Sequence, residues 1–295
     1  MRRASVVFVG ILAAFGIVAG LVAIVMLLTS GGSGTTSGSL TEDPLADPSA
    51  GATTGSVPVV DDEAWGTVEV YDVLDDGTLD PAPADALAAE IWETFRRVAT
   101  PDFAAEVIIE YRVGNAPESD MLAYVYQDES APEYWILAAN RGTSTDPATL
   151  IPTLIHEYAH ILSLGVDQTE PADACPTVET SEGCAFEDSY LAAFHRAFWA
   201  SYGPEAPAPD NDDASVAKAF YAAHAEEFVS DYAATNVVED LAESFTAFVL
   251  EPRPADEAAT TVASKIGFFW RYPELETIRE RVRAEFSDVL SSLVY

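Results

Sequence analysis

Two histidines and a glutamate in IPTLIHEYAHILSL, residues 151–164, have the types and the spacing of a metal site. His156 and His160 are four residues apart, so on a helix they lie on one face, one turn apart. Two such imidazoles can bind one zinc ion, and Glu157 beside them projects toward the open side of the metal. Because zinc lowers the pKa of a bound water to about 7, Glu157 is a candidate general base. The motif therefore predicts a zinc-dependent hydrolase.

The elements around this motif predict a helix over residues 147–164. Asp146 followed by Pro147 suits an N-cap and a first helical turn, and Gly165 suits the position just after the helix. Pro152 removes a backbone donor, so we expect it to kink the first turns or to delay the start of the helix. Apolar residues occupy the arc opposite the histidines, which lets the helix pack into a core while the histidines face a cleft: Ile151, Leu154, Ile155, Tyr158, Ile161 and Leu162.

A catalytic zinc site needs a third protein ligand, and a later segment, TNVVEDLAESFTAFVL, offers one. Glu239 and Glu243 are four residues apart on one side of a predicted helix. Ser163 and Val166 stand where a metzincin would have glycine and histidine, which excludes that class. Two alternatives stay open. Glu239 could instead reach back to Asn236 in a capping box, and Glu243 could be a solvated acid on the helix surface.

The segment DYAATNVVEDLAESF resembles the gluzincin metallopeptidases, in particular the catalytic domain of anthrax lethal factor and its small relatives. In that family a tyrosine stands seven residues before the liganding glutamate. The resemblance covers two segments of about 15 residues each. It implies that Glu243 hydrogen-bonds a liganding histidine and fixes its tautomer. It further implies the remaining site residues: zinc ligands His156, His160 and Glu239, the general base Glu157, and Tyr232 as a hydrogen-bond donor in the transition state.

Alternatives to these assignments also stay open. Glu179 is a rival third ligand because it lies 19 residues after His160, a spacing found in gluzincin aminopeptidases. His195 and His224 could act as acid catalysts or ligands, although both also suit a structural role in amphipathic helices. Tyr232 could be an ordinary packed tyrosine.

Zincins bind an extended peptide along an edge strand. By that analogy, the strand predicted within EYWILAANRG, residues 133–142, is the substrate-binding edge, because it comes just before the histidine helix. A plain core strand is the alternative.

The rest of the chain predicts an α+β fold class. Runs rich in Val, Ile, Tyr and Trp predict strands within residues 65–74, 105–113, 121–128 and 133–142. Apolar residues three and four apart predict helices over residues 84–99, 147–164, 187–201, 214–227, 237–250 and 273–293. With the resemblance, this order implies a zincin-like metalloprotease fold of two lobes, with a strand-rich N-lobe and a helical C-lobe.

The composition excludes nucleic acid as a partner. The formal net charge is −35, with 49 acidic and 14 basic side chains, and such a surface repels phosphate backbones. Hydrophobic residues make up 49% of the chain and aromatic residues 11%, which is too much for a disordered acidic chain. A substantial core is therefore expected.

Residues 4–28 carry no charge and are long enough as a helix to cross a bilayer. The stretch is longer than the apolar region of a cleavable signal peptide, which stays the alternative. Arg2 and Arg3 should remain cytoplasmic, so the chain after the span is expected outside the cytoplasm. The sequence thus predicts three parts: a cytoplasmic stub and transmembrane signal anchor over 1–30, a flexible Gly/Ser/Thr/Pro linker over 31–60, and a metallopeptidase domain over 61–295.

Cys175 and Cys184 are not spaced as a CxxC motif. In an oxidising compartment they are expected to form a disulfide, with two free thiols as the alternative. The sequence as a whole predicts a single-pass, membrane-anchored, extracytoplasmic zinc endopeptidase that hydrolyses a peptide or protein substrate through a zinc-activated water. The alternative is a non-catalytic, membrane-tethered zincin-like domain that binds zinc or a partner.

Overall fold

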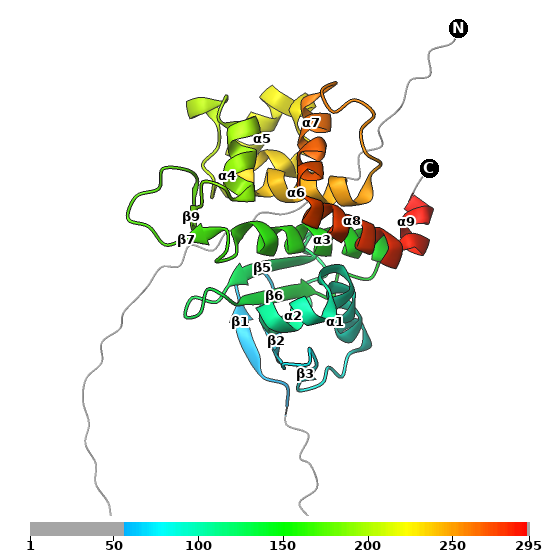
Figure 1. Ribbon diagram of the computed structural model, residues 1–295. Coiled ribbons are helices and arrows are strands. Elements are labelled where there is room, and N and C mark those ends of the chain that lie inside the picture. Colours follow the sequence, from blue (N-terminus) through cyan, green and yellow to red (C-terminus); the bar gives the residue numbers. More distant parts are fainter. Residues whose placement is uncertain (1–55, 294–295) are drawn as a thin grey trace, which may run out of the picture.

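A mixed sheet forms the first part of the chain in the computed structural model, which describes residues 56–293 (Figure 1). The strand order is β1-β2-β4-β6-β5. The short strand β3 lies off this order and pairs with the end of β2, at Asp72 and Val73. All neighbouring strands are antiparallel except β4 and β6, which are parallel. The strands are β1 (Val59–Asp62), β2 (Gly66–Val73), β3 (Leu79–Asp80), β4 (Ile108–Gly114), β5 (Ala123–Gln127) and β6 (Trp135–Asn140).

The prediction that residues 133–142 form the edge strand is wrong. β6 lies between β4 and β5, and all six of its residues are buried. Its unbroken run WILAAN suits a strand covered on both faces, whereas a half-exposed strand alternates polar and apolar residues. β5 precedes β6 in the chain and pairs with it antiparallel, and it forms the edge of the sheet next to α3 (Pro147–Leu164).

Two helices pack with α3 against the sheet: α1 (Ala86–Ala99) and α2 (Pro101–Val107). The apolar face of α1 enters the same core as the sheet, and the Tyr111 hydroxyl of β4 donates to the carbonyl of Ala88 at 3.0 Å. Residues 105–107, predicted as the start of a strand, instead end α2. Thr100 causes this break, because its positive φ of 104° ends α1 while its hydroxyl accepts from the Phe103 amide and caps α2.

The second part of the described chain is mostly helical, and it lies on the other side of α3 from the sheet (Figure 1). The predicted helix over 187–201 is a short α-helix that continues as a π-helical turn, His195–Trp199. The predicted helix over 273–293 breaks at Phe286. The helices are α4 (Tyr190–Phe194), α5 (Ala214–His224), α6 (Val237–Leu250), α7 (Thr261–Phe268), α8 (Pro273–Glu285) and α9 (Ser287–Leu293). With the sheet, they confirm the α+β class.

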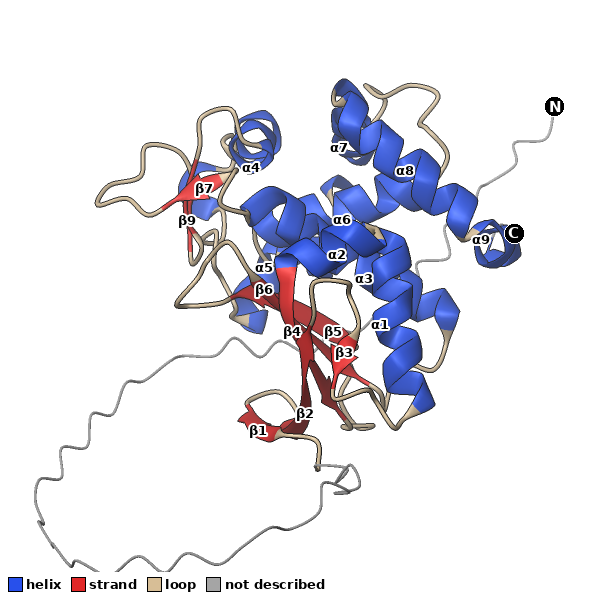
Figure 2. Cartoon of the chain, turned by 60° about the horizontal axis from the view of Figure 1, so that its bottom comes forward, coloured by secondary structure: helices blue, strands red, loops and turns tan. Residues whose placement is uncertain are grey.

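α3 and α6 pack against each other at the centre of the molecule (Figure 2). α3 begins at Pro147, as predicted, and the Asp146 carboxylate caps it by accepting from the Ala148 amide at 2.9 Å. Pro152 lies inside this helix and does not delay its start. The buried face of α6 carries Phe245 and Phe248, whose rings contact Phe269 after α7. These ring contacts pack the other side of α6 against the turn that follows α7.

A disulfide joins Cys175 and Cys184, with a Cα–Cα distance of 5.3 Å, which confirms the predicted pairing. It closes a loop in a small antiparallel sheet that follows α3: β7 (Thr169–Glu170), β8 (Glu179–Thr180) and β9 (Gly183–Ala185). Within residues 56–293, no helix combines the length and apolar character needed to span a membrane. The anchor predicted over residues 1–30 and most of the predicted linker lie outside the described residues.

Candidate metal centre

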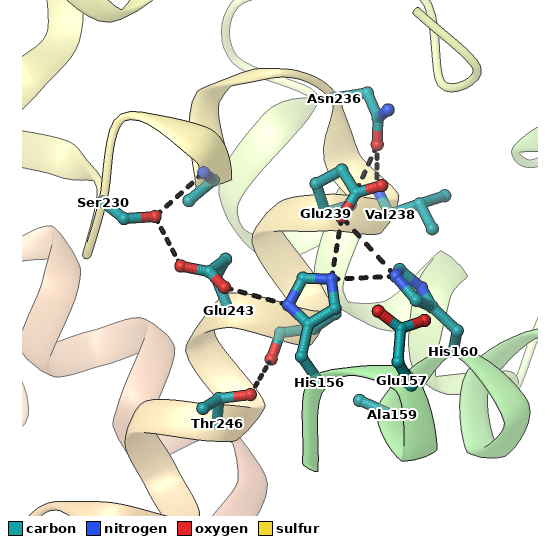
Figure 3. Close-up of polar contacts among 12 residues, drawn as sticks. His156, Glu157, Ala159, His160, Ser230, Asn236, Val238, Glu239, Glu243 and Thr246 are labelled. Atoms are coloured by element: carbon teal, nitrogen blue, oxygen red, sulfur yellow. Dashed lines mark hydrogen bonds and ion pairs between the residues drawn. The ribbon is translucent and has the colours of Figure 1, made fainter. Parts of the chain in front are cut away.

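Three side chains predicted as metal ligands meet where α3 and α6 pack (Figure 3). The Nε2 atoms of His156 and His160 lie 3.0 Å apart. Glu239 Oε2 lies 3.0 Å from Nε2 of His156 and 3.5 Å from Nε2 of His160. One donor atom from each side chain falls within 4.8 Å of the other two, and this is the group of that kind found among residues 56–293.

The start of α6 positions Glu239. The Asn236 side chain caps the helix by accepting from the amides of Val238 at 2.8 Å and Glu239 at 2.9 Å. Asn236 thus forms its half of a capping box. The carboxylate of Glu239, however, lies against the two histidines of α3 and not at the start of its own helix. The cap fixes the backbone, and the side chain is available for the site.

A second carboxylate of α6 holds the other ring nitrogen of His156. Glu243 Oε1 lies 2.9 Å from His156 Nδ1, and Ser230 Oγ donates to Glu243 Oε2 at 2.6 Å (Figure 3). Ser230 is itself fixed, because its hydroxyl accepts from the Ala233 amide at 3.1 Å. A carboxylate at Nδ1 favours the tautomer that carries its proton there, which leaves the lone pair of Nε2 facing the site.

The donor set fits a zinc ion. With the proton of His156 on Nδ1, its Nε2 lone pair and an oxygen of Glu239 face each other at 3.0 Å, and two acceptors so close require a cation or a proton between them. Two imidazoles and one carboxylate are a ligand set of catalytic zinc sites. His160 presents the same Nε2 atom to this point, while its buried Nδ1 has no hydrogen-bond partner within the described part of the chain.

The electrostatics of the site favour positive charge. Burial alone would lower the pKa of His156, but hydrogen bonds and charge from Glu239 and Glu243 outweigh burial and raise this pKa well above its usual value. Burial would likewise raise the pKa of Glu239, yet the charge of His160 and hydrogen bonds from both histidines hold it far below its usual range. A carboxylate that stays ionised when buried suits a metal ligand.

Glu157 lies between the metal-ligand group and the edge strand. Its Oε2 accepts from the Val125 amide of β5 at 3.0 Å, and the side chain is buried. Burial raises the pKa of Glu157 to about 7, although the nearby charges of His156 and His160 partly oppose the shift. The arrangement puts a carboxyl group with a raised pKa beside both the candidate ligands and the edge strand β5.

Tyr232 enters the site from the 3₁₀ turn Tyr232–Ala234, which precedes α6. Its ring centroid lies 5.8 Å from that of His156. Burial, the charges of Glu239 and Glu157, and a hydrogen bond to Glu239 raise the pKa of Tyr232 well above its usual value. The Tyr232 hydroxyl is therefore protonated and lies beside the candidate ligands, where it is hydrogen-bonded to Glu239.

The rival residues lie elsewhere. Glu179 is exposed on β8 and is not part of the converging group. His195 lines a separate cavity of about 550 Å³ beside the disulfide, where burial lowers its pKa. His224 Nδ1 lies 3.0 Å from the carboxylate of Glu227 in another part of the helical region.

Sequence reasoning missed two contributors to the site. Ser230, which holds Glu243, has no spacing that distinguishes it from other serines. The Val125 amide contributes through its backbone, so no residue type identifies it. The sequence does indicate a buried ion pair next to the site, between Lys265 and Asp240. Lys265 stands inside the apolar run VASKIGFFW, where a charged residue must be buried with a partner.

Comparison with models of protein families gives no match to this chain, and neither does comparison with curated proteins. Among solved structures, a match is found to a protein of Bacteroides caccae described as a "putative zinc-binding metallo-peptidase". The two chains are 17% identical, and the match covers 70% of this chain and 78% of the other, with a TM-score of 0.33. This similarity is weak, and the function of the chain is inferred below from the geometry of the site.

Proposed function

We propose that the chain is a zinc-dependent endopeptidase of the gluzincin type, with a zincin-like two-lobed fold similar to the catalytic domain of anthrax lethal factor. One observation supports this most strongly: donor atoms of His156, His160 and Glu239, from two helices, converge within 4.8 Å of one another. Glu157 lies beside them on α3, next to the edge of the sheet. A site that only bound metal for stability would not need this additional buried carboxyl group.

In this proposal His156, His160 and Glu239 hold the zinc ion. When bound, zinc polarises the scissile carbonyl and makes water a better nucleophile at neutral pH. Glu243 and Ser230 orient His156, since the carboxylate fixes the ring through Nδ1.

Glu157 acts as the general base and acid. Its carboxylate takes a proton from the attacking water and passes it to the amine that leaves when the peptide bond breaks. The hydrogen bond from the Val125 amide to Oε2 fixes the plane of the carboxylate, so Oε1 remains for the proton transfer. Tyr232 donates a hydrogen bond to the oxyanion that develops on the substrate carbonyl.

The substrate is an extended peptide that pairs with β5, the observed edge strand, in place of the predicted strand at 133–142. Backbone groups of an antiparallel strand point alternately to the two sides. The Val125 amide points away from β6 and toward Glu157, so the backbone groups of Ala123 and Gln127 also face the free edge. A peptide added there would run past Glu157 and the metal ligands.

We further propose that the domain is tethered outside the cytoplasm by an anchor within residues 1–30. The support is the uncharged stretch of residues 4–28 and the disulfide between Cys175 and Cys184, which suits an oxidising compartment.

The test compares the zinc-loaded full-length chain with a Glu157→Gln variant, using casein and a peptide library as substrates. The wild type is expected to cleave peptide bonds. The variant should bind one zinc ion with unchanged affinity but show a kcat lower by about 10²- to 10⁴-fold, since a general base contributes that much. Tyr232→Phe should lower kcat by about 10²-fold with a smaller effect on KM, because the lost hydrogen bond forms in the transition state.

The alternative is a tethered zincin-like domain that binds zinc without catalysis. If the wild type binds zinc and cleaves no member of the library, the peptidase proposal fails and this alternative replaces it. Equal cleavage by the wild type and Glu157→Gln would remove Glu157 from the mechanism.

A further inference from the structure

A fully buried ion pair adjoins the candidate metal centre through the backbone of α6. Lys265 Nζ on α7 lies 2.7 Å from Asp240 Oδ2, and both side chains are 0% exposed. Asp240 directly follows Glu239 in the chain. Its carboxylate also accepts from Trp199 Nε1 at 2.7 Å and from the Ser244 hydroxyl at 3.2 Å. The carboxylate next to the third ligand is therefore held from three directions.

The same ammonium group also holds the segment that carries Tyr232. Lys265 Nζ donates to the carbonyl oxygen of Glu227 at 2.7 Å and lies 3.8 Å from the centre of the Phe228 ring. These two residues begin the segment 227–236, which continues through Ser230 and Tyr232 to the cap of α6. Lys265 thus contacts both segments that supply side chains to the site from this part of the chain. One is α6, which carries Glu239, and the other is the segment 227–236, which carries Tyr232.

Stability alone does not account for this pair. Removing a carboxylate and an ammonium from water costs several kcal/mol for each ion, and apolar residues of similar volume often give equal or greater stability. What a buried ion pair does provide is a fixed relative position of its partners. Only one arrangement of Lys265, Asp240 and the Glu227 carbonyl satisfies all three groups.

We propose that Lys265 is a positioning residue for the metal centre. It fixes the rotation of α6 about its axis through Asp240 and the start of the segment 227–236 through Glu227, and so places Glu239 and Tyr232 relative to the histidines of α3. The inference depends on the proposed function, because it assigns Glu239 as a ligand.

The geometry makes this position sensitive. Consecutive helical residues point about 100° apart, so Asp240 can face α7 while Glu239 faces α3. At a side-chain radius of about 5 to 6 Å, a rotation of α6 by about 10° would move the Glu239 carboxylate by about 1 Å. Zinc–ligand distances tolerate only about 0.2 Å, so such a rotation would weaken or remove the third ligand.

The test uses the full-length chain and three variants: Lys265→Met, the double variant Asp240→Asn/Lys265→Met, and the control Arg279→Met. Arg279 is also a buried cation that contacts α6, but at its far end, where it donates to the carbonyls of Val249 at 2.9 Å and Glu251 at 2.6 Å. Zinc affinity is measured by competition with a chromophoric chelator, ligand geometry by the absorption spectrum of the Co²⁺ form, and folding by circular dichroism.

Lys265→Met should lower Tm and raise the Kd for zinc by about 10- to 100-fold, the usual effect of removing a group that orients a ligand. The double variant should regain most of the Tm, because no unpaired carboxylate is left buried, but its zinc affinity and Co²⁺ spectrum should stay altered. Arg279→Met should lower Tm with no change in either metal readout.

Unchanged zinc affinity in Lys265→Met, or a double variant that regains both Tm and zinc affinity, would overturn the proposal, because Lys265 would then be structural only. If Lys265→Met does not fold, the double variant decides the question. The metal readouts also separate the two proposals. A wild type that binds zinc without cleaving peptides overturns only the peptidase assignment, whereas a wild type that binds no zinc overturns both.

Discussion

Truncation of Glu243 tests whether the carboxylate that contacts Nδ1 of His156 supports metal binding. In Glu243→Ala, two contacts disappear: the one with His156 Nδ1 at 2.9 Å and the one with the Ser230 hydroxyl at 2.6 Å. The hydroxyl can rotate toward another acceptor, but the ring nitrogen cannot. His156 is only 5% exposed, so its Nδ1–H would lose the Glu243 acceptor in a buried site.

The expected loss of zinc affinity follows from the removal of that hydrogen bond. A hydrogen bond to a charged group contributes about 1.5 to 3 kcal/mol, and each 1.4 kcal/mol is tenfold in an equilibrium constant. We therefore expect Glu243→Ala to raise the Kd for zinc by about 10- to 100-fold. Glu243→Gln should raise it by less than about tenfold, because the amide oxygen can accept from His156 while the amide nitrogen donates to Ser230.

The assay is competition for zinc with a chromophoric chelator, with circular dichroism to confirm folding. Thr246→Ala is the matched control, since Thr246 lies on the same helix near the site and its hydroxyl donates to the carbonyl of Ala242 at 2.9 Å (Figure 3). A folded Glu243→Ala protein with the zinc affinity of the wild type would refute the argument that Glu243 orients His156.

Two further predictions concern stability. Zinc at about 1,000 times its Kd should stabilise the fold by about 4 kcal/mol and raise Tm by roughly 8 to 16 °C over the chelator-treated protein, and thermal melts with and without EDTA check this. An equal Tm in both conditions would mean that His156, His160 and Glu239 do not hold the metal in the folded state. Reduction of the bond between Cys175 and Cys184 should remove about 2 to 3 kcal/mol and lower Tm by roughly 5 to 10 °C, because it releases a short closed loop in the unfolded chain. Melts with and without dithiothreitol measure the shift, and a change below about 1 °C would contradict the predicted contribution.

The sequence predicted those parts of the site that depend on local signals. Asp146 and Pro147 mark the start of α3, Asn236 marks the start of α6, and both helices have the predicted bounds. Helical geometry then puts His156 and His160 on one face, whatever the rest of the chain does. The α+β class also followed from the order of the predicted strands and helices, and the disulfide from the predicted oxidising compartment.

Strand order was decided by the tertiary structure. The residues of β5 and β6 have strand-forming character, but that character does not say which neighbours each strand pairs with. Pairing depends on which faces the helices cover and on the connection between the two strands. The observed order places β6 inside the sheet and leaves β5 to meet Glu157.

Spacing along one helix fixed two of the candidate ligands, and the packing of distant helices fixed their partners. Glu239 lies 83 residues after His156, and only the contact of α6 with α3 brings the two side chains to 3.0 Å. Lys265 belongs to a third helix, and its role depends on where the buried carboxylate of Asp240 points. Local sequence sets which face of a helix a residue occupies, because that depends on backbone geometry alone. Which surface that face meets depends on how the whole core packs, and only the folded chain determines it.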